Sequence, residues 1–220
     1  ASLMLGKNVA TDTYWSGSLE EARLLNIPRS LPWIYTEYIN QNQQFRFYRQ
    51  SPLEINLGFA ITSWYDTDWK VKRKLTVSST SVSGSHIDFP YLVALNNDTD
   101  LLANAKSDGT DILFTDANDE AKYAHELISY SNGSLKAWVR LPSLDSVNGA
   151  TFNMYYGNPN ATPQATASAV WTEDYVGGWH LNDNNGTIFS DSTAYNRHMY
   201  VSGTNLPTSR SAGFIDKSVT

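Results

Sequence analysis

Hydrophobic and polar residues alternate with a period of two along the middle of the chain. Apolar side chains recur at alternate positions in residues 71–77, 112–114, 135–141 and 152–156. Alternation of this kind predicts β-strands that bury one face. Turn sequences such as Asn132-Gly133 and Asn148-Gly149 separate the stretches. The pattern predicts a β-sandwich over residues 64–163.

Two further stretches refine this prediction. Residues 89–95, Phe-Pro-Tyr-Leu-Val-Ala-Leu, form an unbroken apolar run, which is typical of a central strand covered on both faces. Residues 70–74, Lys-Val-Lys-Arg-Lys, form the one basic run. We interpret this run as an edge strand whose charges deter pairing with other sheets, in preference to a phosphate site.

The segment before the sandwich predicts one short helix near residues 30–39. Ser30 is a preferred N-cap residue, and Pro32 lies in the first turn, where its missing N–H costs no hydrogen bond. Residues at helical spacing then continue as far as Tyr38. Residues 170–201 contain apolar segments and an Asn-Gly turn that predict further strands. The expected fold is therefore all-β with a single short helix.

The composition of the chain excludes several classes of function. The chain has 16 Lys and Arg against 22 Asp and Glu, so its net charge of -6 argues against a general nucleic-acid binder. It contains no cysteine, which excludes disulfides, thiolate metal sites and a cysteine nucleophile. Its apolar runs are shorter than the roughly 18 residues that a membrane helix needs.

The carboxylates and histidines do not form a catalytic pattern. Glycosidases of the concanavalin type place two carboxylates at alternate positions of one strand, whereas Glu20-Glu21 and Glu173-Asp174 are adjacent and would point to opposite faces. The four histidines are scattered through the sequence. We interpret Glu21 as a structural partner of Arg23 and expect the protein not to be an enzyme.

Three sets of residues are candidate sites. Four aspartates around one predicted strand make a weak calcium candidate, with ordinary turns as the alternative: Asp108, Asp111, Asp116 and Asp119. Four Asn-x-Ser/Thr triplets are glycosylation candidates: Asn97, Asn132, Asn160 and Asn185. Four tryptophans near the predicted domain junctions could stack on sugars, although core packing is the favoured alternative: Trp64, Trp69, Trp171 and Trp179. No cofactor other than calcium is expected.

The middle of the chain resembles domain of unknown function 2341, found in microbial extracellular proteins. The motifs that carry this resemblance occur in the family's order, and they are DWKVKRKLTV, DFPYLVAL, SDGTDILFTDANDE, YAHELISY, LKAWVRLPSL and FNMYYGNP.

The flanking segments resemble laminin-G-like, concanavalin A-like jelly rolls of microbial surface proteins. The first segment resembles the C-terminal end of such a jelly roll and matches it at Glu21, Arg23, Arg29, Ser30, Trp33, Ile34, Glu37, Tyr38, Asn40 and Gln41. The last segment, with GWHL and DSTAYNRH, resembles its start. There Ala194, Tyr195 and Met199 replace the usual Gly, Asn and Gly.

These resemblances imply four regions. Residues 1–50 correspond to the end of a jelly roll, 51–63 to a connection, 64–163 to the sandwich, and 164–220 to the start of a jelly roll. Incomplete sheets leave backbone groups unpaired, so we expect the two halves to complement each other within a chain or between chains.

The implied function is that of a structural or adhesive module at the cell surface or outside the cell. The expected partners are copies of the chain or adjacent repeats of a larger protein, assembled as an array or filament. The alternative is a carbohydrate-binding accessory region of a secreted glycan-active enzyme, with glycans as partners.

Overall fold

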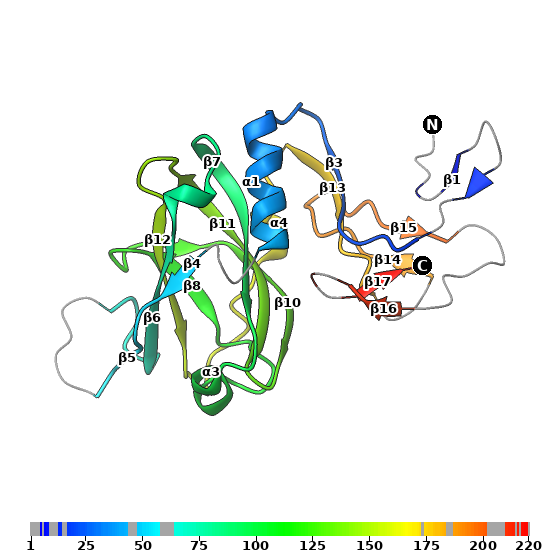
Figure 1. Ribbon diagram of the computed structural model, residues 1–220. Helices are drawn as coiled ribbons and strands as arrows, with labels where there is room; N and C mark the ends of the chain where they lie inside the picture. Colours follow the sequence, from blue (N-terminus) through cyan, green and yellow to red (C-terminus); the bar gives the residue numbers. More distant parts are fainter. Residues whose placement is uncertain are drawn as a thin grey trace.

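A computed structural model describes residues 5, 7–8, 13–14, 17–43, 48–57, 64–172, 174–183, 187–201, 210–213, 215 and 217–219. Two antiparallel sheets face each other in a sandwich, and helix α1 (Leu31–Asn42) lies along one edge of it (Figure 1). The predicted all-β fold with a central sandwich and a short helix is confirmed. In the described part of the chain, no helix has the length and apolar content to cross a membrane.

The larger sheet has six strands. They are β4 (Tyr48–Gln50), β5 (Glu54–Ile55), β6 (Val71–Val77), β8 (Leu113–Asp116), β9 (Lys122–Tyr123) and β12 (Ala150–Tyr156). Their order is β4-β6-β12-β8-β9, and β5 also pairs with β6. The prediction that the basic run forms an edge strand is therefore wrong, because β4 and β5 flank β6 on one side and β12 flanks it on the other.

The smaller sheet has three strands in the order β10-β11-β7. They are β7 (His86–Leu95), β10 (His125–Ser131) and β11 (Ser134–Leu144). Short helical turns connect the strands: η1 (Ser79–Ser81), α3 (Thr99–Asn104) and α4 (Ala167–Val170). Strand β7 is buried on both faces from Phe89 to Leu95, as its apolar run predicts, but it lies at the edge of its sheet and not at the centre.

The core fills the space between the two sheets. Alternate residues of β7 and β11 meet alternate residues of β6 and β12 there, and these side chains are almost wholly buried. The largest of them include Phe89, Tyr91, Phe152 and Tyr156, and Phe114 of β8 joins them. The period-two pattern thus identifies the strands of this core correctly, because one face of each sheet needs burial.

Side chains from the N-terminal segment satisfy the free edge of β7. The Asn40 amide on α1 accepts a hydrogen bond from the Leu92 N–H at 2.7 Å and donates one to the Leu92 carbonyl at 3.1 Å. The Tyr48 hydroxyl on β4 donates to the Ala94 carbonyl at 2.5 Å. These bonds replace the neighbouring strand that a central position would provide, which explains how an edge strand can be apolar on both faces.

Helix α1 forms where its local sequence predicts it. The Ser30 hydroxyl accepts a hydrogen bond from the Trp33 N–H at 3.3 Å, and Pro32 occupies the first turn. Trp33 packs against His86 and Phe89, with ring centroids 5.1 and 4.8 Å apart. The buried face of the helix therefore belongs to the edge of the sandwich.

The remaining strands form four two-stranded antiparallel pairs among the described residues. They are β1 (Lys7–Asn8) with β2 (Thr13–Tyr14), β3 (Ala22–Leu25) with β13 (Tyr175–Trp179), β14 (Ile188–Phe189) with β15 (Met199–Tyr200), and β16 (Arg210–Ala212) with β17 (Lys217–Val219). The pairing of β3 with β13 joins the segment before the sandwich to the segment after it, within one chain (Figure 1).

Candidate functional site

A buried group of charged residues lies where β3, β13 and the outer face of the small sheet meet. We call it the Arg23 network, and it consists of Glu21, Arg23, Glu37, Glu126, Trp138, Trp171 and His180. Its members come from the N-terminal segment, the sandwich and the C-terminal segment, so it joins the three parts of the chain.

Arg23 is the centre of this network. Its guanidinium lies between the indole rings of Trp138 and Trp171, 4.4 and 4.6 Å from their centroids. It forms ion pairs with Glu21 at 2.9 Å and with Glu37 on α1. Flat, delocalised guanidinium groups suit such stacking and forked ion pairs better than lysine does. The ion pair with Glu21 agrees with the structural interpretation of that carboxylate.

His180 connects Glu21 to Glu126 of β10. The His180 Nδ1 atom lies 2.6 Å from a Glu21 carboxylate oxygen, and Nε2 lies 3.0 Å from Glu126 Oε2. The same Glu126 oxygen accepts a hydrogen bond from the Trp171 indole at 2.7 Å, and the other accepts one from the Ser192 hydroxyl at 2.6 Å. Every carboxylate of the network therefore contacts a cation or a hydrogen-bond donor.

Burial and pairing set the protonation states. Burial disfavours the charged imidazolium of His180, but the carboxylates of Glu21 and Glu126 outweigh it and raise its pKa to about 10. Burial would raise the pKa of Glu21, but His180 and Arg23 outweigh that effect and lower it. At neutral pH His180 and Arg23 are cations between carboxylates, so the network is a set of buried ion pairs.

A second cation extends this contact along α1. The Arg29 guanidinium lies 4.0 Å from the ring centroid of Trp33 and 5.3 Å from that of Tyr175, and it pairs with Asp174 at 3.3 Å. Burial raises the pKa of the Tyr175 hydroxyl to about 12, with a contribution from Glu37. Tyr175 therefore stays neutral beside these cations.

Apolar packing surrounds the charges. Leu92 and Trp138 project from the outer face of the small sheet, and they form one buried cluster with Val170, Trp171, Tyr175 and Ile215. Because this face is covered by residues of the C-terminal segment, the charges beside it are shielded from solvent. The arrangement can hold segments together, since breaking a buried ion pair leaves an uncompensated charge.

The sequence identifies only part of this network. Glu21, Arg23 and Glu37 belong to a recognisable motif, and His180 lies in GWHL. Glu126, Trp138 and Ser192 lie on different elements and share no local spacing. Only the topology of the sandwich brings them together.

The four candidate calcium ligands are used separately. Asp111 accepts hydrogen bonds from the backbone N–H groups of Lys106, Gly157 and Asn158 at 2.7 to 3.1 Å. Asp108 accepts from Thr110, while Asp116 accepts from the N–H groups of residues 120 and 121. Asp119 contacts Lys72 and Asn153. Within the described ranges, no three acidic or histidine side chains form a group that could hold a metal ion.

Three of the four candidate sugar-stacking tryptophans are buried. Trp69, Trp171 and Trp179 expose only 6%, 2% and 5% of their surface, so their rings present no open face to a sugar. Trp64 is half-buried, and its ring lies 4.9 Å from the ammonium group of Lys72.

The glycosylation candidates occupy different surroundings. Asn97, Asn132 and Asn160 are exposed, and the first two lie in turns with positive φ. Asn185 lies outside the described residues.

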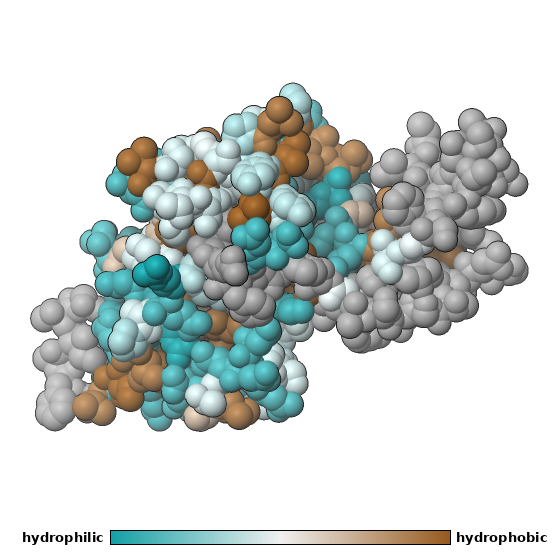
Figure 2. All heavy atoms as spheres, viewed as in Figure 1, coloured by the Kyte–Doolittle hydropathy of each residue, from teal (hydrophilic) through white to brown (hydrophobic). Residues whose placement is uncertain are grey.

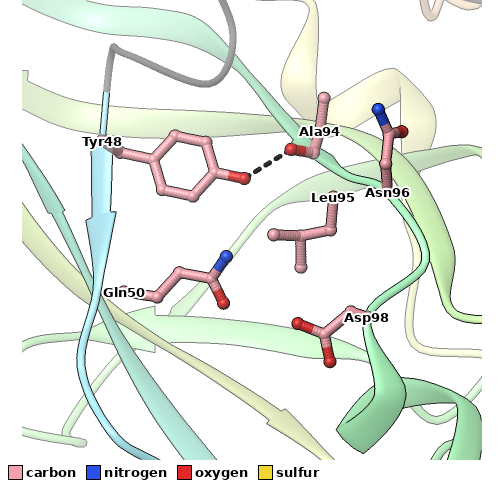
Figure 3. A pocket seen from close by; sticks show the side chains of 6 residues that line it. All are labelled: Tyr48, Gln50, Ala94, Leu95, Asn96 and Asp98. Atoms are coloured by element: carbon pink, nitrogen blue, oxygen red, sulfur yellow. Dashed lines mark hydrogen bonds between the residues drawn. The ribbon is translucent and has the colours of Figure 1, made fainter.

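A shallow hollow of about 210 Å³ opens between β4 and the end of β7 (Figure 3). Its lining includes Tyr48, Gln50 and Asp98. The buried guanidinium of Arg73 donates hydrogen bonds to Gln50 and Asp98, both at 2.5 Å, and to Asp100 at 2.7 Å. Two of the polar side chains at the hollow thus accept hydrogen bonds from Arg73, and Asp98 also pairs with its charge.

Comparison with protein families gives one match. Residues 108–196 match the model of the family described as Domain of unknown function (DUF2341). This range contains Glu126, Trp138, Trp171 and His180, whereas Glu21, Arg23 and Glu37 lie outside it. No curated protein and no solved structure was found to match the chain. The two tryptophans that enclose Arg23 therefore lie in the matched range.

Proposed function

We propose that this chain is a structural, non-enzymatic module of an extracellular surface protein. In this proposal, the sandwich holds the closing and opening segments of a jelly roll side by side. Neighbouring copies, or adjacent repeats of a larger chain, then supply the strands that complete the sheet. The module would form arrays or filaments, with an adhesive role arising from their repetition.

The observation that carries the proposal is the pairing of β3 with β13. Leu25 pairs with Tyr175 and Ala22 with Trp179 in an antiparallel register. One face of this ribbon packs on the sandwich through the Arg23 network. A two-stranded ribbon is marginal as a sheet by itself, which favours the addition of further strands from a neighbour.

Exposed apolar residues beside the ribbon support the same proposal. Leu31, Ile34, Tyr35 and Tyr38 recur at helical spacing on the outer face of α1, and each exposes half or more of its surface. Leu24 of β3 and Ile27 after it are about 40% exposed. Figure 2 shows hydrophobic residues gathered over the upper part of α1. Contiguous apolar surface of this kind is typical of protein–protein contacts.

Sedimentation velocity over a range of protein concentrations tests the proposal. We expect larger species to form as the concentration rises, and negative-stain images to show regular arrays. Leu24→Lys should shift the equilibrium towards the monomer, because a charged side chain beside a strand edge opposes the addition of another strand.

Ile87→Lys is the matched control. Ile87 is 74% exposed on β7, at a site outside the proposed contact, so this variant should assemble as the unmodified protein does. A monodisperse monomer at all concentrations for the unmodified protein would contradict the proposal. Equal effects of the two lysine substitutions would also contradict it.

A further inference from the structure

Lys72, Asp119 and Asn153 form a buried polar group on the outer face of the large sheet. Lys72 lies on β6, Asn153 on the neighbouring strand β12, and Asp119 in the turn after β8 (Figure 1). Asp119 Oδ2 lies 3.2 Å from Lys72 Nζ, and Asp119 Oδ1 accepts a hydrogen bond from Asn153 Nδ2 at 2.7 Å. One carboxylate thus bridges an amine and an amide.

This group is shielded from solvent. The Lys72 and Asp119 side chains are 7% and 4% exposed, and Asn153 as a residue is 1% exposed. Trp69, Leu113 and Tyr155 pack nearby as one apolar cluster, with Trp64 at its margin. Burial raises the pKa of the Tyr155 hydroxyl, with a contribution from Asp119. Proton transfers between the three polar groups would therefore occur with little access of water.

The surrounding backbone fixes the orientation of both partners. Asp119 adopts a positive φ of 64°, and its Oδ1 also accepts a hydrogen bond from the Thr115 hydroxyl at 3.0 Å. Asn153 Nδ2 faces the carbonyls of residues 116 and 117 at 3.1 and 3.4 Å. The Asn153 Oδ1 atom is buried and has no hydrogen-bond partner among the described residues. The amide is thus held with its carbonyl oxygen unpaired.

We propose that Lys72 and Asn153 form an intramolecular amide bond, with Asp119 as the proton carrier. The Lys72 Nζ atom bonds to Cγ of Asn153, the Cγ–Nδ2 bond breaks, and nitrogen leaves as ammonia. This inference concerns a covalent modification of the folded chain and does not depend on the proposed function.

The proton transfers balance without an added reagent. Asp119 accepts a proton from the Lys72 ammonium, and the neutral amine then attacks the Asn153 carbonyl carbon. Asp119 delivers this proton to Nδ2, and a second proton passes from the amine nitrogen along the same path. The released ammonia takes up this second proton, so the products are a neutral amide and an ammonium ion, with no oxidation or reduction. Because one buried carboxylate contacts both Lys72 and Asn153, the folded chain holds the two groups together and supplies the effective concentration that such a reaction needs.

Two other charged residues, Glu54 and Lys74, lie near this group, but both are more exposed than Asp119 and Lys72. Glu54 also lies 3.1 Å from Lys72 Nζ, but its side chain is 51% exposed, whereas that of Asp119 is 4% exposed. Lys74 pairs directly with Asn153 in the strand register, yet it is exposed. Lys72 is the buried lysine held next to the carboxylate that contacts the amide.

The mass of the intact protein tests this inference directly. After overnight incubation of the folded chain, we expect a mass about 17 Da below that calculated from the sequence, which corresponds to the loss of one ammonia. Trypsin should then release one species in which peptide 71–73 is joined to peptide 141–197. This peptide evidence separates the bond from an Asn-Gly succinimide, which has the same mass but joins no peptides.

Three variants complete the experiment. Lys72→Arg and Asp119→Asn should each retain the full calculated mass, because the first removes the nucleophile and the second removes the proton carrier. Lys74→Arg is the matched control on the same strand and should still show the loss.

Three outcomes would overturn the inference. The first is a folded unmodified protein with its full calculated mass. The second is a loss of about 18 Da with Lys72 joined to Asp119, and the third is a bond at Lys74. Since the first measurement uses the unmodified chain, it remains decisive even if a variant fails to fold.

Discussion

Single side chains make contacts in this molecule that a neighbouring strand or segment would otherwise provide. Asn40 satisfies the edge of β7 in place of a strand, and Arg23 lies between two indole rings at the contact between three segments. Both side chains are buried and hold polar partners, so neither tolerates loss of its polar groups without an energetic cost.

Arg23→Met tests the network at its centre. The substitution removes the cation between Glu21 and Glu37 and leaves buried carboxylates without it, so we expect the free energy of unfolding to fall by about 3–5 kcal/mol. Urea denaturation followed by tryptophan fluorescence measures this change. Arg49→Met, at an exposed position on β4, should change the free energy by less than about 0.5 kcal/mol. A similar small change for Arg23→Met would show that the network does not stabilise the fold.

His180 predicts a specific pH dependence. Its pKa is raised to about 10 in the folded protein, against about 6.5 in an unfolded chain. The stabilisation is fully present below pH 6.5 and is lost as the pH rises towards 10, because the folded state then holds a proton that the unfolded state has released.

Comparison of the unmodified protein with His180→Gln isolates this effect. The difference in their unfolding free energies should shrink between pH 7 and 9.5, by up to about 1.4 kcal/mol per pH unit. His198→Gln, which alters an exposed histidine, serves as the control. A difference that is constant across this range would contradict the assignment of His180 as a buried cation.

At the scale of elements, the sequence predicted where strands lie along the chain better than it predicted which strands pair with one another. The period of two identifies β6, β11 and β12 because alternate residues of each strand face the core between the sheets, and the local caps identify α1. Strand order was not predictable. The basic run predicted an edge position for β6, but β4 and β5 pair with that edge. The apolar run predicted a central position for β7, but β7 is an edge strand that α1 covers.

The candidate site was predictable only where its residues form a local motif. Glu21 and Arg23 lie close together in one motif. Glu126 and Trp138 lie in two separate motifs, YAHELISY and LKAWVRLPSL, and only the pairing of β10 with β11 brings them together. The burial of Arg73 was not predictable from its local sequence either. It occupies an inward position of β6, where Asp98 and Asp100 lie close enough to neutralise its charge. Long-range pairing of charges leaves no periodic signal in the sequence.

Asn40→Leu tests the role of α1 as the cover of the β7 edge. The variant leaves the buried N–H and carbonyl of Leu92 without their side-chain partner, so we expect a loss of about 2–4 kcal/mol in unfolding free energy. Asn42→Ala, at an exposed position on the same helix, is the matched control and should be nearly neutral. Equal stability of both variants would show that Asn40 does not satisfy that edge.

At the scale of the whole molecule, the segments before and after the sandwich meet through β3 and β13. Strand β3 pairs with β13, the Arg23 network fixes that ribbon to the small sheet, and α1 closes the edge beside it. We propose that these segments associate within one chain and present a ribbon that neighbouring copies extend.

A disulfide between β3 and β13 tests this claim most directly, because the chain contains no cysteine of its own. The Asn26 N–H, directly after β3, donates to the carbonyl of Asp174, directly before β13, at 3.0 Å, so Asn26→Cys with Asp174→Cys places two thiols at the end of this strand pair. Asn26→Cys with Leu102→Cys is the control, since Leu102 lies in α3 at the far end of the sandwich (Figure 1). Under mild oxidation we predict a disulfide within single chains for the first pair and none for the control. Free thiols in the first pair, or disulfides formed only between chains, would contradict the account.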